Sequence, residues 1–134
     1  MNSILNLSEA TLLALHAMAI IAKEGENLVN TKAIAKQINA SENHLAKVLQ
    51  RLNKAGLIKS IRGPQGGFIL TKESNSISLL EVYEAIEGTF KLKKCLLHND
   101  KCPFKNCILG TFHLDASKEF KNFFSSKFLS DFAV

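Results

Sequence analysis

The sequence contains no apolar run long enough to cross a membrane. Its most apolar stretch, residues 10–22, includes Thr11 and His16 and is shorter than the about 20 residues that a spanning helix needs. Residues 1–9 carry neither lysine nor arginine, so they lack the positive region that opens a secretory signal peptide. We therefore expect a cytoplasmic protein that has no membrane partner.

The chain also lacks the usual signatures of an enzyme. No pairing of a nucleophile with a base is recognisable, and the glycine-rich residues 63–67 lead into a predicted strand rather than into a nucleotide-binding helix. Neither an internal repeat nor a low-complexity tract is present. With 134 residues, 46% hydrophobic and 22% charged, the composition is that of one globular unit. We predict a binding protein rather than an enzyme.

Cysteine is scarce, and its few copies are clustered. Cys95, Cys102 and Cys107 all fall within thirteen residues, and an odd number cannot pair completely within one chain. Such clustering in a cytosolic protein favours metal or redox chemistry over a disulfide framework. Three thiolates on one loop suit an iron–sulfur cluster, or zinc with His98 as a fourth ligand. The alternative is three reduced cysteines without a ligand.

Acidic residues are under-represented in the first half of the chain. Residues 1–72 contain nine basic and four acidic side chains, a net charge of +5, whereas residues 73–134 contain eight of each. An excess of positive charge confined to one region indicates a polyanionic partner, most often nucleic acid. A generic basic surface is the other interpretation.

The pattern of caps and apolar positions predicts a mostly α-helical chain with a small β-hairpin. Ser8 is expected to cap a first, buried helix, Thr31 a short helix over residues 32–37, and Ser41 a helix over residues 42–54. Residues 57–62 and 68–71 read as two strands joined by a glycine-rich turn. Ser78 opens a helix that Gly88 ends, and a final helix is expected from residue 108 to about residue 126.

Residues 31–71 therefore form a helix–turn–helix followed by a hairpin, the arrangement of winged-helix DNA-binding domains. The outward face of the helix over residues 42–54 is polar and basic, and its first residues would meet base edges in the major groove. The hairpin tip would reach the DNA backbone or a minor groove. The alternative is an ordinary solvated face. The predicted contacts with double-stranded DNA are Ser41, Asn43, His44, Lys47, Arg51, Arg62, Gly63 and Pro64.

The last helix is unusually aromatic. Six of the nine phenylalanines lie between Phe112 and Phe132, and apolar residues recur along the helix at helical spacing. A chain this small has little core with which to cover such a helix, so we predict a homodimer interface there. A helix folded back on its own core is the alternative.

Residues 41–68, SENHLAKVLQRLNKAGLIKSIRGPQGGF, resemble the Rrf2 family of bacterial winged-helix transcriptional regulators. The likeness extends over the whole chain and includes the three-cysteine loop of the cluster-binding branch. It implies a winged helix-turn-helix domain over residues 1–88, a cluster loop over residues 89–107, and a dimerisation helix and tail over residues 108–134. The implied function is a DNA-binding transcriptional regulator whose operator affinity an iron–sulfur cluster controls. A metal-free regulator that senses through thiols or a partner is the alternative.

The resemblance also implies ligands for a 2Fe–2S or 4Fe–4S cluster. Cys95, Cys102 and Cys107 would supply three. The fourth in some relatives is an acid near the N-terminus of the other subunit, which corresponds here to Glu9, and His98 is our second choice. Others use a histidine soon after the third cysteine, but Gly110 occupies the matching position. His113 lies further along and ranks behind Glu9 and His98.

Overall fold

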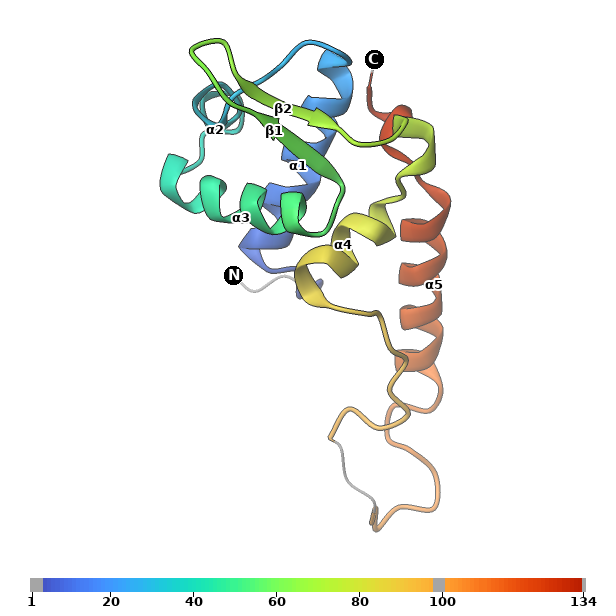
Figure 1. The fold of residues 1–134 in the computed structure, drawn as a ribbon. Helices are drawn as coiled ribbons and strands as arrows, with labels where there is room; N and C mark the ends of the chain where they lie inside the picture. Colours follow the sequence, from blue (N-terminus) through green and yellow to red (C-terminus); the bar gives the residue numbers. More distant parts are fainter. Residues whose placement is uncertain (1–3, 98–100, 134) are drawn as a thin grey trace.

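The computed structural model describes residues 4–97 and 101–133. Within these ranges the chain forms five α-helices and one two-stranded antiparallel hairpin (Figure 1). In chain order the elements are α1 (Glu9–Glu24), α2 (Thr31–Ile38), α3 (Glu42–Lys54), β1 (Ile58–Ile61), β2 (Gly67–Leu70), the 3-10 turn η1 (Ser74–Ser76), α4 (Leu79–Glu87), α5 (Phe112–Ser126) and the 3-10 turn η2 (Leu129–Asp131). The predicted fold class, mostly helical with a hairpin wing, is confirmed. None of these helices combines the length and apolar character needed to span a membrane.

Serine side chains begin the helices where the sequence predicts. Ser8, Ser41 and Ser78 accept backbone N–H groups of α1, α3 and α4 at 3.1, 3.3 and 3.1 Å. These bonds satisfy donors that have no partner within the helix. The second helix differs, because Asn30 rather than Thr31 is its cap and accepts the Ala33 N–H at 2.8 Å.

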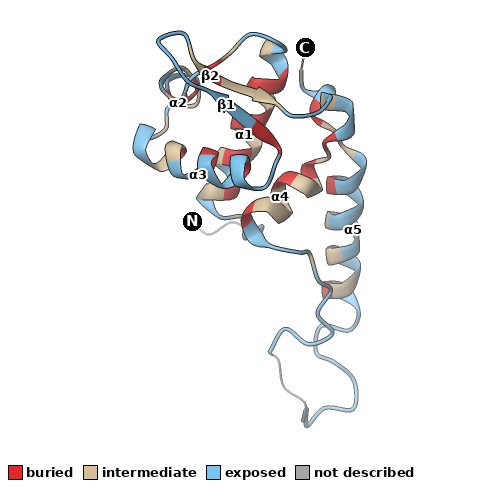
Figure 2. Ribbon diagram, in the orientation of Figure 1, coloured by how far each residue is buried: buried red, intermediate tan, exposed pale blue. Residues whose placement is uncertain are grey.

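The core lies where α1, α3 and α4 meet. Figure 2 shows the buried residues gathered on the inward faces of these helices. Met18, Leu49 and Val82, one from each helix, are buried to 2% exposure or less. Because α1 contributes residues on several sides, it is the central helix of the domain, as its nearly all-round apolar pattern predicts.

The hairpin is anchored to the connector before α2. Phe68 and Val29 exchange backbone hydrogen bonds, at 2.9 Å for the Phe68 N–H and 3.4 Å for the Val29 N–H. A Cβ at Gly67 would lie only 2.7 Å from the Val29 backbone, so the close approach requires glycine. This contact fixes the hairpin's direction relative to the helices.

The C-terminal segment returns to the core. The final helix begins at Phe112 and not at Ile108, because residues 108–111 form a turn in which Gly110 adopts a φ of 60°. After α5, the Leu129 N–H donates to the Ile77 carbonyl oxygen at 3.0 Å, and the Leu129 side chain is fully buried. The last residues therefore help to close the core of the winged-helix part.

Candidate functional site

The outer face of α3 is open to solvent at its N-terminal end. Ser41, Asn43 and Lys47 are exposed, and His44 is half-buried. Leu45, Val48, Leu49 and Leu52 turn toward the core on the opposite face. The apolar stripe thus fixes the rotation of α3 and leaves a polar, basic surface outward. That orientation matches the outward polar, basic face expected from the sequence, whereas the contact of this face with DNA stays a prediction.

His44 lies next to an acid of α1. Its Nδ1 is 3.7 Å from Oε1 of Glu9, whose side chain is exposed. The pair joins two predicted site residues, since the sequence assigns His44 to DNA and Glu9 to a cluster in another subunit. Within one chain these two side chains are neighbours at the start of α1 and α3.

Arg51 occupies a different position from the other predicted DNA contacts. Its Nη2 donates to the carbonyl oxygen of Ile86, in the last turn of α4. The guanidinium thereby joins the C-terminal half of α3 to the end of α4. This contact gives Arg51 a role within the fold, in addition to the DNA contact predicted from sequence.

A group of polar side chains joins the end of α4 to the start of α1. Thr11 is fully buried, and its Oγ1 donates to Glu87 Oε1 at 2.7 Å. Ser8 Oγ donates to the same carboxylate oxygen. These hydrogen bonds, with the smaller attraction of Arg51, lower the pKa of Glu87 below its ordinary value of 4.5. The sequence gives no sign of these contacts, because Glu87 lies 76 positions after Thr11 and 79 after Ser8 along the chain.

The tip of the hairpin carries the remaining predicted DNA residues. Arg62, Gly63 and Pro64 are exposed, and Gly63 has a φ of 126°, a conformation that side-chain-bearing residues rarely adopt. The Gly66 N–H donates to the Gly63 carbonyl oxygen at 2.9 Å and closes the turn. The tip and the first turn of α3 both lie toward the left of the view in Figure 1.

The cysteines lie on the loop between α4 and α5. Figure 1 shows this loop projecting away from the helical body. Cys95, Cys102 and Cys107 are exposed, and all three line one mainly apolar cavity of about 510 Å³. His98 lies outside the described residues. The cavity brings the predicted thiol ligands together, whereas Glu9 of the same chain does not line it.

His113 also lines this cavity. It lies in the first turn of α5, and its side chain is only 7% exposed. Its Nε2 is 2.7 Å from the carbonyl oxygen of Lys94, while its Nδ1 is buried and has no hydrogen-bond partner. Three soft thiols and an unpartnered ring nitrogen form a donor set that fits an iron–sulfur cluster.

The thiols are not yet arranged around one point. Among residues 4–97 and 101–133, no three His, Cys, Asp or Glu side chains are placed so that they could hold a metal ion. Binding a cluster would therefore require the loop to draw the thiols inward. The loop backbone is well suited to such a movement, because residues 91–97 and 101–111 are exposed.

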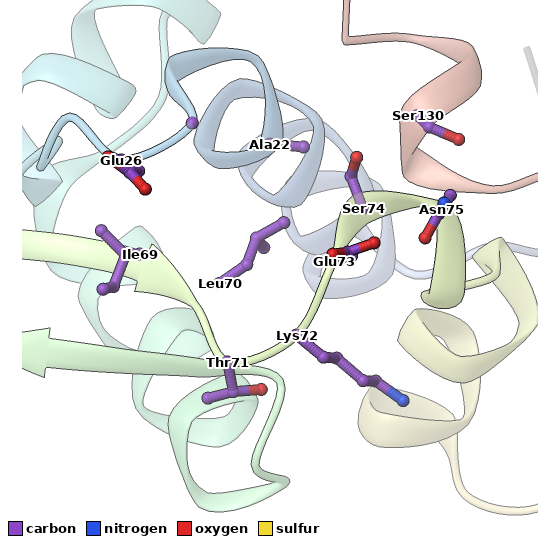
Figure 3. A pocket seen from close by; sticks show the side chains of 11 residues that line it. Ala22, Glu26, Ile69, Leu70, Thr71, Lys72, Glu73, Ser74, Asn75 and Ser130 are labelled. Atoms are coloured by element: carbon purple, nitrogen blue, oxygen red, sulfur yellow. The ribbon is translucent and has the colours of Figure 1, made fainter.

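Another cleft, of about 790 Å³, lies between the end of α1, the end of β2 and η1 (Figure 3). Lys72 extends from its edge toward α4, where its Nζ is 2.9 Å from Glu81 Oε2. None of the residues predicted from sequence to bind DNA or a metal lines this cleft.

The exposed face of α5 is aromatic. Phe112 and Phe123 are 71% and 50% exposed, whereas Phe124 is buried. Phe120 is partly covered, because it stacks on Phe124 at 4.2 Å and on Phe90 at 5.6 Å between ring centroids. The helix thus packs one side against its own core, as one of the two interpretations of the sequence expects, and presents an uncovered apolar side on the other. The homodimer interface stays a prediction.

Comparisons with known proteins identify relatives over nearly the whole length. The profile of a family described as "Rrf2: Iron-dependent Transcriptional regulator" matches residues 7–134. The HTH-type transcriptional regulator NsrR of Bacillus licheniformis is 37% identical over 107 residues, which are 79% of this chain and 72% of that protein.

Solved structures give the same result for the fold. CymR, the global cysteine regulator of B. subtilis, superposes with a TM-score of 0.83 at 30% identity and covers 97% of each chain. The structure of T. potens IscR has a TM-score of 0.76 at 29% identity, covering 96% of this chain and 85% of that one. These relatives place the hairpin as the wing of a winged-helix domain.

Proposed function

The chain belongs to the Rrf2 family of transcriptional regulators, and we propose that it binds operator DNA as a homodimer under the control of an iron–sulfur cluster. Members of this family are regulators rather than enzymes, as predicted from the sequence. The observation that carries the proposal is the single cavity that contains Cys95, Cys102, Cys107 and the buried ring of His113. The family's description as iron-dependent supports it.

DNA recognition is assigned to α3 and the wing. The exposed Asn43 and Lys47 can reach base edges in the major groove, and Ser41 can donate its hydroxyl proton to a phosphate. Arg62, with Gly63 and Pro64, presents a cation on a thin tip that fits a minor groove. A dimer would place two copies of α3 in successive major grooves, about 34–36 Å apart.

The exposed apolar side of α5 supports the dimer. An apolar surface that includes Phe112 and Phe123 is costly to leave in water, and a second copy of the same helix offers a matching surface. The segments then have the roles proposed from sequence: DNA binding for residues 1–88, sensing for residues 89–107 and dimerisation for residues 108–134.

A cluster bound by the three thiolates would supply an iron centre that is sensitive to oxidants, nitric oxide and iron supply. In this proposal, a change in the conformation of the cysteine loop changes the position of α3. Glu87 ends α4 eight residues before Cys95, and it is held to α1 by Ser8 and Thr11. The neighbouring Ile86 carbonyl accepts from Arg51 of α3. A shift at the start of the loop therefore acts directly on contacts of α1 and α3.

A regulator of the same fold that senses through its thiols, without a metal, is the second candidate. Two observations favour it: all three cysteines are exposed, and no ligand set is preformed in the described residues. CymR, a structural relative, is named a cysteine regulator. Exposed thiols can be oxidised reversibly, and this would also change the loop.

Two measurements test the proposal. Protein purified without oxygen should contain iron and acid-labile sulfide, and Cys102→Ala should lose both. Selection from a pool of random DNA duplexes should enrich a sequence with two related half-sites. A variant that carries both Lys47→Ala and Arg62→Ala should show no enrichment. Absence of iron and sulfide with intact DNA selection would favour the thiol sensor, whereas failure of the selection would overturn the DNA-binding proposal.

A further inference from the structure

His113 is held in an unusual state for a buried histidine. Its Nε2 lies 2.7 Å from the carbonyl oxygen of Lys94, and its other ring nitrogen, Nδ1, is buried without any partner. Buried polar atoms are normally paired, so an orphaned ring nitrogen needs an explanation. The ring lines the cavity that contains the three cysteines.

The contact with Lys94 determines which nitrogen carries the proton. A carbonyl oxygen only accepts hydrogen bonds, so the proton of the neutral ring must be on Nε2. Nδ1 then has a lone pair and no hydrogen. Metal-ligating histidines have this arrangement, in which one nitrogen donates to a carbonyl or carboxylate while the other binds the metal.

The same contact places His113 beside the first cysteine. Lys94 directly precedes Cys95, and its hydrogen bond to the first turn of α5 joins the two ends of the loop. The second and third cysteines line the same cavity. Glu9 lies at the start of α1, where its carboxylate faces His44, and it does not line this cavity.

We propose that His113, through Nδ1, is the fourth protein ligand of the cluster, in place of Glu9 of the partner subunit or His98. This inference rests on the proposed cluster function. All four ligands then come from one chain, and Lys94 acts as a positioning residue that fixes the ring through its backbone. Ligation requires no proton release from the ring. Cluster assembly consequently does not depend on dimerisation.

The test uses the full chain, reconstituted without oxygen from ferrous iron and sulfide, with histidine ring nitrogens labelled with ¹⁵N. Pulsed electron paramagnetic resonance of the reduced protein should show a strongly coupled histidine nitrogen. The coupling should persist in Glu9→Ala, in His98→Ala and in the control His16→Ala, whose exposed ring contacts Leu12 in α1. It should vanish in His113→Phe, which keeps an aromatic ring but has no donor.

Cluster stability provides a second measurement. His113→Phe should lose iron to a chelator about tenfold or more faster than the wild type, and His113→Cys should restore retention by providing a thiolate. Circular dichroism checks that each variant is folded. A histidine coupling that survives in His113→Phe, or its absence from a wild type that holds iron and sulfide, would overturn the assignment. A wild type that takes up no iron or sulfide would instead overturn the cluster proposal itself, and His113 with it.

Discussion

Glu9 Oε1 lies 3.7 Å from His44 Nδ1, so an acid at the start of α1 stands beside the helix assigned to DNA. The Glu9 side chain is exposed and the His44 side chain is half-buried, and a solvent-accessible pair of this kind contributes about 0–1 kcal/mol to stability. If α3 binds DNA as proposed, Glu9 should affect operator affinity more than stability. A carboxylate beside α3 repels phosphates and competes for the His44 ring.

Glu9→Ala should therefore raise affinity for the selected operator a few-fold, and it should lower the free energy of unfolding by no more than about 1 kcal/mol. Fluorescence anisotropy with labelled duplex measures the first and urea unfolding the second. Glu26→Ala, which removes an exposed acid from the connector after α1, is the matched control. Unchanged or weaker binding by Glu9→Ala would contradict this role.

Substitutions on α3 and the wing should affect operator affinity and stability differently. Lys47→Ala and Arg62→Ala should each weaken operator binding by about 1–3 kcal/mol and leave stability unchanged, because both side chains are exposed. Arg51→Ala should also lower the free energy of unfolding, by about 1 kcal/mol, since it leaves the Ile86 carbonyl without its donor. Lys118→Ala on α5 is the control. Equal operator affinity of Lys47→Ala, Arg62→Ala and the wild type would refute the assigned DNA surface.

The two sides of α5 should respond differently to a charge. Phe112 and Phe123 lie on the exposed side of α5. Phe112→Asp and Phe123→Asp should therefore give folded monomers in sedimentation analysis, because each places a charge in the proposed apolar interface. Phe120→Asp should instead reduce folding, because its ring stacks on Phe124 and Phe90. If both exposed-side variants remain dimers, the interface lies elsewhere.

The hydrogen bonds to Glu87 should make part of the protein's stability depend on pH. Hydrogen bonds from Ser8 and Thr11 lower the pKa of Glu87, so the folded state favours its ionised form. This stabilisation is complete above the ordinary pKa of 4.5 and is lost as the pH falls through the lowered value. Glu87→Gln should melt at a lower temperature than the wild type at neutral pH, and the difference should shrink in acid. A constant difference across that range, or the same behaviour in Glu119→Gln, would contradict the assignment.

Local chemistry made much of the fold predictable. Ser8, Ser41 and Ser78 are strong caps before apolar helical patterns, and each begins the expected helix. The second helix has two adjacent cap-forming residues, Asn30 and Thr31, and the sequence alone does not decide between them. The expected start of α5 at residue 108 is wrong, because apolar spacing continues through residues 108–111, whereas the positive φ of Gly110 keeps these residues in a turn.

The candidate site was less predictable, because it depends on contacts between distant segments. Cysteine spacing indicates the ligand loop, and the basic face of α3 indicates the DNA surface. The burial of His113 follows only when α5 packs so that its ring reaches the Lys94 carbonyl, 19 positions earlier. The partnership of Arg51 with α4 likewise requires the tertiary fold, since an outward charged residue on a helix gives no sign of it.

In the proposed mechanism, occupancy of the iron–sulfur cluster sets the affinity for operator DNA. The most direct measurement compares one preparation before and after removal of its iron under anaerobic conditions, using anisotropy on the selected duplex, with Cys102→Ala as the permanently cluster-free reference. We expect operator affinity to change by about 5–150-fold, the range of a 1–3 kcal/mol coupling, and the depleted protein to match Cys102→Ala. Equal affinity of the loaded and depleted forms, with iron and sulfide present at the start, would contradict it.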